Sequence, residues 1–394
     1  MRLFTQTHAA HTIFTSHSRG RTAMYLYHQG KHTRQAHVAL PEGTFEEEHG
    51  REGFFGPVSH LYRVHPPTDW NNFEGPLRPQ AFDFTQIEPS DLADPVGGRT
   101  RLLYNNDVAV SVSRRSADMP FYFRNADGDE LYFVHEGEGF METDYGTLHF
   151  EKGDYIVIPR VTTYRIHLTS PSSFFLIIEA FPKLTIPNAT QKGLIGVHAL
   201  FDLSAITVPK LPEQYDERAG QQHEIRVLRE GVISSVSYPF NPLDAVGWKG
   251  DLFPWKINVR DIRPVMSHRV HLPPPAHTTF LMNNAVVCTF LPRPLEEDAD
   301  ALKIPFYHRN TDYDEVLFYH EGNFFSRDNI KPGMVTLHPT GVHHGPHPKA
   351  LANMHNLKRT DEIAVMLDTA NTLYVTSEAE QVEWKEYWQS WMKK

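Results

Sequence analysis

The sequence predicts an all-β protein built from two similar β-barrels. The stretch FYFRNADGDELYFVHEG, residues 121–137, returns later in the chain as FYHRNTDYDEVLFYHEG, residues 306–322. Around both copies, short runs of Val, Ile, Phe and Tyr are broken by Gly, Asp and Asn, a pattern typical of antiparallel strands joined by tight turns. The 29 prolines are spread along the 394 residues and disfavour long helices.

Along the chain, the pattern divides into four parts. Residues 1–23 contain no acidic residue, and we expect a disordered extension that is native, a transit peptide or the result of a start codon upstream of Met24. Residues 24–185 are expected to form an N-terminal barrel half, residues 186–256 a Pro-rich connecting region, and residues 257–394 the C-terminal half. Within the last part, the final stretch EWKEYWQSWMKK has tryptophans at helical spacing and predicts a short C-terminal helix.

The composition restricts the classes of partner. The chain has 38 basic and 48 acidic residues, a net charge of −10, and no long basic block, which argues against a nucleic-acid partner. No apolar run is long enough to span a bilayer, so we expect no membrane partner. The single cysteine, Cys288, cannot form an internal disulfide, which favours a reducing compartment and a cytoplasmic location.

Two spaced motifs in the second repeat predict a metal site. His308 is followed seven positions later by Glu315, and six residues separate Glu315 from Gly322. Further on, GMVTLHPTGVHH has the spacing G-x5-P-x-G-x2-H and ends at His344. The two motifs resemble the signature motifs of the cupin barrel and occur in their usual order. Asn310 stands where the first motif ordinarily has a second histidine.

The predicted ligands are therefore two histidines and one carboxylate. His308 and Glu315 are an odd number of positions apart, so a turn within NTDYD must bring both side chains to one face. His344 would arrive from another strand. Two histidines and one carboxylate on one face of the ion are typical of non-haem Fe(II) oxygenases, although Zn, Mn and Ni also suit such ligands. Asp314 is the alternative carboxylate.

The first repeat acts as an internal control for this prediction. It keeps Gly137, Gly153 and Pro159 of the two motifs, and it keeps Glu130 at the position of Glu315. At the positions of the two histidines, however, it has Phe123 and Tyr164. We therefore interpret the shared glycines and prolines as folding signals and the two histidines of the second repeat as the chemical groups.

The second repeat also resembles the homogentisate 1,2-dioxygenase family. The resemblance lies in YHRN at 307–310, LH at 337–338 and HGP at 344–346, and in the upstream stretches GREGFFGPVSHLYRVHPPTDW and VGWKGDLFPWK. It implies duplicated cupin, jelly-roll barrels with an inactive first half, and a homo-oligomer. It also implies an Fe(II)-dependent dioxygenase that uses dioxygen to cleave homogentisate, a small aromatic acid, to maleylacetoacetate in tyrosine and phenylalanine catabolism.

By this resemblance, His308, Glu315 and His344 would bind the iron. His338 matches an active-site histidine, our candidate base for the second hydroxyl of the substrate, and His271 approximately matches another. The remaining candidates for substrate contact are Tyr307, Arg327 and His343, each of which also has an ordinary packing or surface interpretation.

Two departures from the family pattern leave the substrate open. In the family the glutamate follows the first histidine by six positions, whereas here it follows by seven, and the segment 321–332 is short. The alternatives are a dioxygenase of a related hydroquinone or gentisate-like acid, a zinc-dependent cupin isomerase and a bicupin without enzymatic activity.

Overall fold

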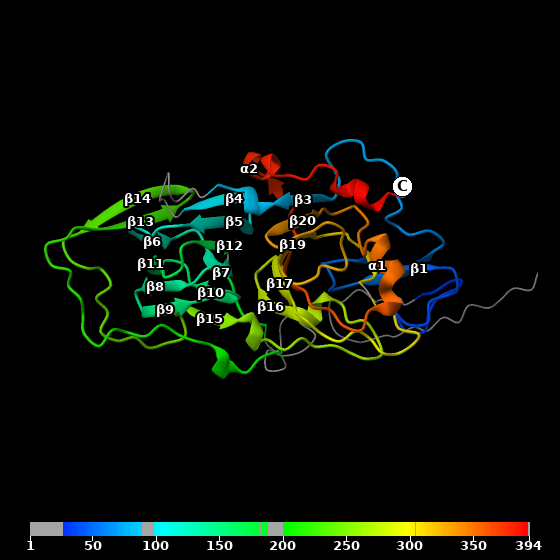
Figure 1. Cartoon of the computed structure of the whole chain (residues 1–394), viewed down its shortest axis with the longest axis horizontal. Coiled ribbons are helices and arrows are strands. Elements are labelled where there is room, and N and C mark those ends of the chain that lie inside the picture. Colours follow the sequence, from blue (N-terminus) through cyan, green and yellow to red (C-terminus); the bar gives the residue numbers. More distant parts are fainter. Residues whose placement is uncertain (1–26, 89–97, 182, 188–199, 304, 393–394) are drawn as a thin grey trace, which may run out of the picture.

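The computed structural model is an all-β chain of two barrels that lie side by side (Figure 1). It describes residues 27–88, 98–181, 183–187, 200–303 and 305–392. The predicted fold class, duplicated jelly-roll barrels, is confirmed. The expected extension at residues 1–23 lies outside the described residues.

The N-terminal barrel consists of two facing sheets. The strands of the first are β4 (Arg99–Tyr104), β5 (Val108–Arg115), β7 (Asp129–Glu136), β10 (Asp154–Ile158), β12 (Ser173–Ala180), β15 (Trp255–Asn258) and β22 (Tyr374–Val375). The strands of the second are β6 (Tyr122–Asn125), β8 (Gly139–Thr143), β9 (Gly146–Phe150), β11 (Thr163–Leu168), β13 (His223–Arg229) and β14 (Val232–Tyr238). Their orders are β15-β10-β7-β12-β5-β4-β22 and β14-β13-β6-β11-β8-β9.

The C-terminal barrel is built in the same way around a larger and a smaller sheet. The larger contains β3 (Gln80–Asp83), β16 (Thr278–Leu281), β17 (Ala285–Phe290), β19 (Asp314–Glu321), β20 (Met334–His338) and β21 (Ile363–Thr369). The smaller contains β1 (Phe45–Gly50), β2 (Val58–Arg63) and β18 (Tyr307–Asn310). The order β20-β19-β21-β17 repeats the order β10-β7-β12-β5 of the N-terminal barrel, so the duplication extends to strand pairing.

The N-terminal segment belongs to the C-terminal barrel, unlike the division expected from the sequence. Strand β1 pairs in parallel with β18, and β3 pairs with β20. Conversely, β13, β14 and the beginning of β15, which belong to the expected connecting region, complete the N-terminal barrel. Figure 1 shows the blue N-terminal strands beside the yellow to red half of the chain. These additions cover sheet edges that would otherwise leave backbone N–H and C=O groups unpaired.

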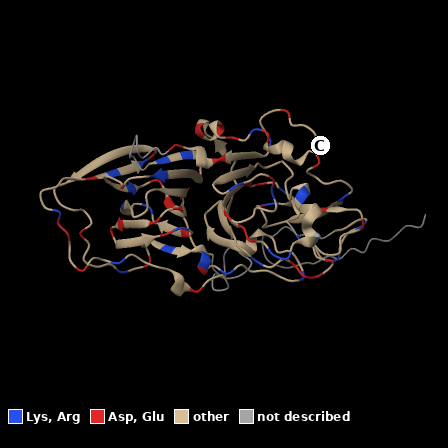
Figure 2. Cartoon of the chain, in the orientation of Figure 1, with Lys and Arg blue, Asp and Glu red and all other residues tan. Residues whose placement is uncertain are grey.

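The main hydrophobic core lies between the two larger sheets. Alternate residues of β19, such as Val316 and Phe318, join the same cluster as Leu131 and Phe133 of β7. The intervening residues of β19, including Leu317, face the interior of the C-terminal barrel. Because strand side chains alternate between faces, Glu315 shares the inner face with Leu317. Figure 2 shows that charged residues of both signs are interspersed along both barrels.

Equivalent histidines of the two repeats meet in the interface between the barrels. His135 and His320 lie 185 positions apart, are both buried, and join their Nδ1 atoms by a hydrogen bond of 2.8 Å. One ring must donate and the other accept, so the hydrogen bond is lost when both Nδ1 atoms carry protons. Burial lowers the pKa of each histidine to about 3.

We therefore expect this histidine pair to make the fold sensitive to acid. Between pH 6.5 and about 3, the two histidines bind protons in the unfolded chain but not in the folded one. The contribution of the pair to the free energy of unfolding is therefore fully present above pH 6.5 and is lost as the pH falls through this window. The loss approaches about 1.4 kcal/mol per pH unit for each histidine. Urea unfolding at pH 7 and pH 5 should show a smaller difference for the double variant His135→Leu/His320→Leu. If the free energy of unfolding falls equally between pH 7 and pH 5 in the wild type and the double variant, the histidine pair is not the source of the acid sensitivity.

Helices are short and few among the described residues. They are α1 (Pro348–Asn353), α2 (Ser377–Gln381) and the 3-10 helices Phe84–Gln86, Leu203–Ala205, Val259–Asp261, Pro274–His277, Met354–Asn356 and Tyr387–Trp391. The helix predicted at the C-terminus is thus a five-residue 3-10 helix, whose Tyr387 and Trp391 are buried against Ala81. In the part of the chain that the structure describes, no helix has the length and apolar character needed to cross a membrane.

Candidate metal centre and its cavity

Three potential metal ligands converge inside the C-terminal barrel. His308 lies on β18, Glu315 on β19, and His344 follows β20 and forms a bridge with His308 through backbone hydrogen bonds of 2.9 and 3.0 Å. All three side chains are buried. Glu315 Oε2 lies 3.4 Å from His308 Nε2 and 3.5 Å from His344 Nε2. The predicted ligands therefore do come together.

Backbone carbonyls orient both imidazoles. The Nδ1–H of His308 donates to Phe306 O over 3.1 Å, and the Nδ1–H of His344 donates to Val342 O over 3.2 Å. This leaves the Nε2 lone pair of each ring directed toward the carboxylate. Fixing the tautomer through the other ring nitrogen is the usual arrangement of metal-binding histidines.

The donor set fits a divalent cation. His344 Nε2 is buried and has no hydrogen-bond partner, an arrangement that is costly unless a ligand satisfies it. Burial lowers the pKa of His308. Burial alone would raise the pKa of Glu315, but the three histidines around it hold this pKa well below its usual range. Neutral imidazoles and an ionised carboxylate are the protonation states that metal binding requires.

Asp314, the alternative carboxylate, has a different task. Its Oδ1 accepts hydrogen bonds from the backbone N–H and the hydroxyl of Thr340, and its Oδ2 accepts from the N–H of Leu373. Both oxygens therefore fix loops at the end of the barrel. The structure favours Glu315 as the ligand.

His338 lies behind the metal centre rather than in the cavity, which corrects its predicted role as a base. Its Nδ1–H donates to Glu315 Oε1 over 2.9 Å, and its Nε2 accepts from the hydroxyl of Tyr387 over 3.3 Å. Its ring also stacks on that of His344, with centroids 4.9 Å apart. The family position is thus occupied by a histidine that positions two ligands. The sequence spacing correctly aligned His338 with the family position, but it could not predict the direction in which the side chain points.

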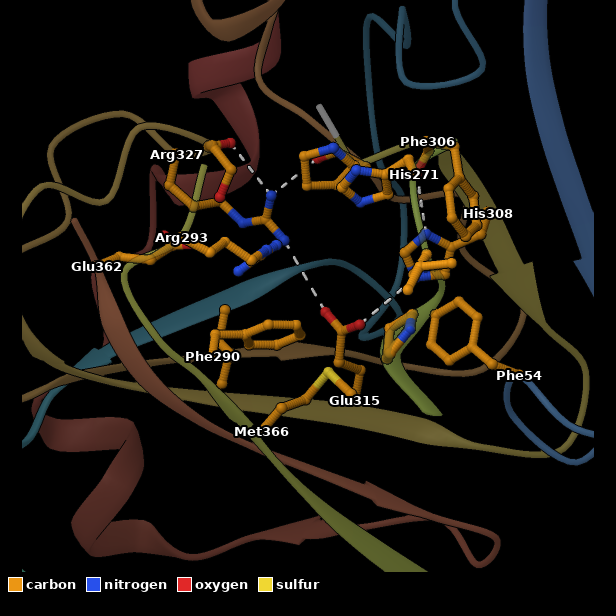
Figure 3. Close-up of a pocket in the computed structure, with 16 residues that line it drawn as sticks. Phe54, His271, Phe290, Arg293, Phe306, His308, Glu315, Arg327, Glu362 and Met366 are labelled. Atoms are coloured by element: carbon orange, nitrogen blue, oxygen red, sulfur yellow. Dashed lines mark hydrogen bonds and ion pairs between the residues drawn. The ribbon is translucent and has the colours of Figure 1, made fainter. Parts of the chain in front are cut away.

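A largely apolar cavity opens on the other side of the ligands (Figure 3). Phe54, Phe290, Phe306 and Met366 line it together with His308 and Glu315. Of the other predicted site residues, His271 and Arg327 line the cavity, whereas Tyr307 and His343 do not. Tyr307 alternates with His308 and packs beside Phe45, and His343 Nδ1 contacts Glu47.

His271 presents one ring nitrogen to the cavity and anchors the other. Its Nδ1–H donates to Glu296 Oε1 over 2.9 Å, which leaves Nε2 as a proton acceptor. The residue is buried, and burial lowers its pKa, so the neutral ring prevails near neutral pH. A neutral imidazole held by a carboxylate is suited to accept a proton.

Two buried arginines border the cavity, and they differ in their partners. Arg327 donates from Nη1 to Gly345 O over 3.0 Å and to Ser326 O over 3.2 Å, and its Nη2 lies 3.9 Å from Glu315 Oε1. Arg293 makes a single long hydrogen bond from its guanidinium, 3.4 Å to Leu291 O. Among the described residues, no carboxylate lies within ion-pair distance of Arg293.

Arg293 and its surroundings were not predicted from the sequence. Burial lowers the pKa of Arg293, as expected for a cation without a close counter-ion, and burial raises the pKa of the nearby Glu362 to about 7. Arg293 lies in a loop between strands and belongs to no motif, so only the tertiary fold could identify it. Phe54, by contrast, belongs to an upstream stretch that carried the family resemblance.

In the N-terminal barrel, Arg99 takes the place that a metal ion would fill. Phe123 and Tyr164 pair across β6 and β11 as His308 and His344 do across their bridge. The guanidinium of Arg99 lies 2.5 Å from Glu130, 3.1 Å from the Tyr164 hydroxyl and 5.1 Å from the centroid of the Phe123 ring. The retained Glu130 is therefore neutralised by a cation of the chain itself.

We expect Arg99→Leu to destabilise the protein strongly. Glu130 and Glu179, which lies 3.4 Å from the same guanidinium, would be left buried without their counter-ion, at a cost of about 3–5 kcal/mol. Urea unfolding of the full chain measures this loss. In the double variant Arg99→Leu/Glu130→Leu part of the stability should return, and a double variant less stable than Arg99→Leu would contradict the pairing.

The fold and the site together define a class of protein, a bicupin in which one barrel offers two histidines and one carboxylate to a metal ion. Residues 58–259 match the family model described as homogentisate 1,2-dioxygenase N-terminal, and residues 272–394 match the one described as homogentisate 1,2-dioxygenase C-terminal. The chain belongs to the homogentisate 1,2-dioxygenase family.

Similar proteins differ in how much of their length they share with this chain. A protein of Saccharolobus solfataricus, provisionally named a dioxygenase, is 32% identical over 93% of this chain and 99% of that protein. The homogentisate 1,2-dioxygenase of Nitrobacter hamburgensis is 25% identical over 71% of this chain, which aligns with 64% of that enzyme. A solved cupin 2 conserved barrel domain protein from Leptotrichia buccalis overlaps 69% of this chain and 88% of that chain at 11% identity and a TM-score of 0.31.

Proposed function

We propose that this protein is an Fe(II)-dependent dioxygenase that cleaves the ring of homogentisate to give maleylacetoacetate. One observation supports the proposal most strongly. The cavity that exposes His308 and Glu315 also contains a buried arginine, Arg293, without a close counter-ion. A ring that binds beside the metal and carries a carboxylate would satisfy both features.

Fe(II) is the ion that best fits the proposed reaction at His308, Glu315 and His344. Two histidines and one carboxylate leave coordination positions free, and Fe(II) bound there would supply a Lewis acid for a phenolate together with redox chemistry for dioxygen. The residues of the chain hold the ion, orient the ring and keep water away.

His271 is the group that we assign to proton transfer. It lines the cavity, and Glu296 holds its Nδ1–H, so its Nε2 can accept the proton of a substrate hydroxyl. This role passes to His271 from His338, which faces Glu315 instead of the cavity. Phe54, Phe290 and Phe306 provide flat apolar surfaces for an aromatic ring and exclude water.

Arg293 is the group that we assign to the substrate carboxylate. Arg327 already donates to the Ser326 and Gly345 carbonyls, and its charge partly balances that of Glu315. It is therefore less available than Arg293 to bind a substrate carboxylate. Arg293 has only a long hydrogen bond and a ring contact with Phe290, whose centroid lies 5.9 Å away. A guanidinium can form two parallel hydrogen bonds to a carboxylate, which makes it a strong selector for an acid.

Oxygen uptake by anaerobically Fe(II)-loaded protein tests the proposal, with homogentisate, gentisate and hydroquinone offered separately. We expect rapid uptake with homogentisate, slow or no uptake with hydroquinone, and none after iron is removed. Faster uptake with gentisate would replace the proposed substrate. No uptake with any of the three, in protein shown to hold iron at this centre, would overturn the proposal.

A further inference from the structure

A second group of potential metal ligands lies outside the cavity, on the small sheet of the C-terminal barrel. It consists of His37, in the loop before β1, Glu48 on β1 and His60 on β2, directly opposite Glu48 in the strand pairing. Each residue offers one ligand atom within 4.8 Å of the other two. His37 and Glu48 are buried, and His60 is half-buried.

A second carboxylate, Glu46, orients His37 from behind. Glu46 Oε2 accepts from His37 Nδ1 over 3.0 Å and from the His37 backbone N–H over 2.9 Å, and its Oε1 accepts from the hydroxyl of Tyr62. The remaining ring nitrogen, His37 Nε2, is thereby turned toward Glu48, 3.9 Å away. A carboxylate that holds the far nitrogen of an imidazole is characteristic of metal sites.

Two polar groups of the cluster lack ordinary partners. Within the described residues no hydrogen-bond donor reaches the Glu48 carboxylate, although its side chain is only 9% exposed. His60 Nδ1 is buried without a hydrogen-bond partner and lies 3.4 Å from Glu46 Oε1. Buried polar groups normally find partners, so an ion that joins them would remove an unfavourable feature of this site.

The cluster is separate from the cavity but touches the strand that supplies His308. The His37 ring stacks on Phe306, with centroids 4.2 Å apart, and Phe306 lines the cavity on its other side. Strand β1 pairs with β18 so that Glu48 is the backbone partner of His308. His60 also lines a surface groove, through which an ion can arrive from solvent.

We propose that His37, Glu48 and His60 bind a second divalent metal ion, of which Zn²⁺ is the best suited. Zn²⁺ accepts two imidazoles and one carboxylate with a water molecule as the fourth ligand, and such sites bind it more tightly than Fe²⁺. Because none of the three residues lines the cavity, we assign the ion a structural task. It fastens the His37 loop to the β1–β2 hairpin, beside the strand that carries His308.

A proton is the rival occupant of this site. Burial lowers the pKa of His60, but the nearby carboxylates of Glu46 and Glu48 outweigh burial and raise this pKa overall. A protonated His60 would then form a salt-bridge cluster that needs no metal. Metal content distinguishes the two occupants and does not depend on the proposed reaction.

The test is the number of Zn²⁺ ions per full-length chain after chelation, equilibrium dialysis against Zn²⁺ and mass spectrometry of the metal. We expect two ions in the wild type, one in His308→Phe, one in Glu48→Gln and none in the double variant. The control Glu47→Gln removes a neighbouring buried carboxylate on the opposite face of β1 and should keep two. Circular dichroism checks that each variant is folded.

His60→Phe gives an independent test, because its half-exposed side chain tolerates replacement better than that of Glu48. In the His308→Phe background it should remove the remaining Zn²⁺ and, with Co²⁺ as a probe, the visible d–d absorption. A folded His308→Phe protein that binds no Zn²⁺ would overturn the proposal. So would one Zn²⁺ that remains in both His308→Phe/Glu48→Gln and His308→Phe/His60→Phe.

Discussion

His308→Phe is expected to give a folded protein that has lost the metal ion of the cavity and its oxygen uptake. Phenylalanine is already accommodated at the equivalent position of the N-terminal barrel. There Phe123 pairs with Tyr164 as His308 pairs with His344. Removing a residue that only orients a metal ligand lowers metal affinity or activity by about 10- to 100-fold. Loss of the ligand itself should therefore lower both by more than that.

Metal analysis, circular dichroism and oxygen uptake on the same preparation measure this effect. His343→Phe is the matched control, since it removes the neighbouring imidazole, which contacts Glu47 and does not line the cavity. The control should retain the metal of the cavity and most of the activity. A His308→Phe protein that still takes up oxygen at the wild-type rate would refute the assignment of the ligands.

The repeat explains why the metal ligands could be predicted from the sequence. The two copies share Gly137/Gly322, Gly153/Gly333 and Glu130/Glu315 but differ at two histidines, so the comparison separates folding signals from chemical groups. Glu130 shows the limit of that comparison. The same residue type is a candidate ligand as Glu315 in one barrel and the partner of Arg99 in the other, and only the fold brings Arg99 to it.

The sequence pattern could not predict the direction of individual side chains or which strands pair at the edges of the sheets. His338 has the family spacing, yet it is the cross-strand partner of Glu315 and faces that ligand from behind. Strand β1 contains three consecutive buried glutamates, an unusual composition for a strand, and the sequence does not reveal that it pairs with β18. Long-range pairing is decided by which sheet edge is free, and this depends on the whole fold.

Arg293→Met is expected to lower the specificity constant for homogentisate by about 100-fold while leaving the fold intact. A charge-assisted hydrogen bond to a buried carboxylate is worth about 1.5–3 kcal/mol, and about 1.4 kcal/mol corresponds to a factor of ten. The effect should appear mainly in KM, because the carboxylate lies away from the reacting ring. Steady-state oxygen uptake over a range of substrate concentrations measures it.

Hydroquinone, which has no carboxylate, separates this role of Arg293 from a structural one. Removing an anchor for the acid should leave the uptake rate with hydroquinone unchanged or raised, so the preference for homogentisate collapses. The free energy of unfolding should stay level or increase, because the variant removes a buried cation whose guanidinium makes only a 3.4 Å hydrogen bond to Leu291 O. Equal losses with both substrates, or a large loss of stability, would show that Arg293 supports the fold instead of selecting the acid.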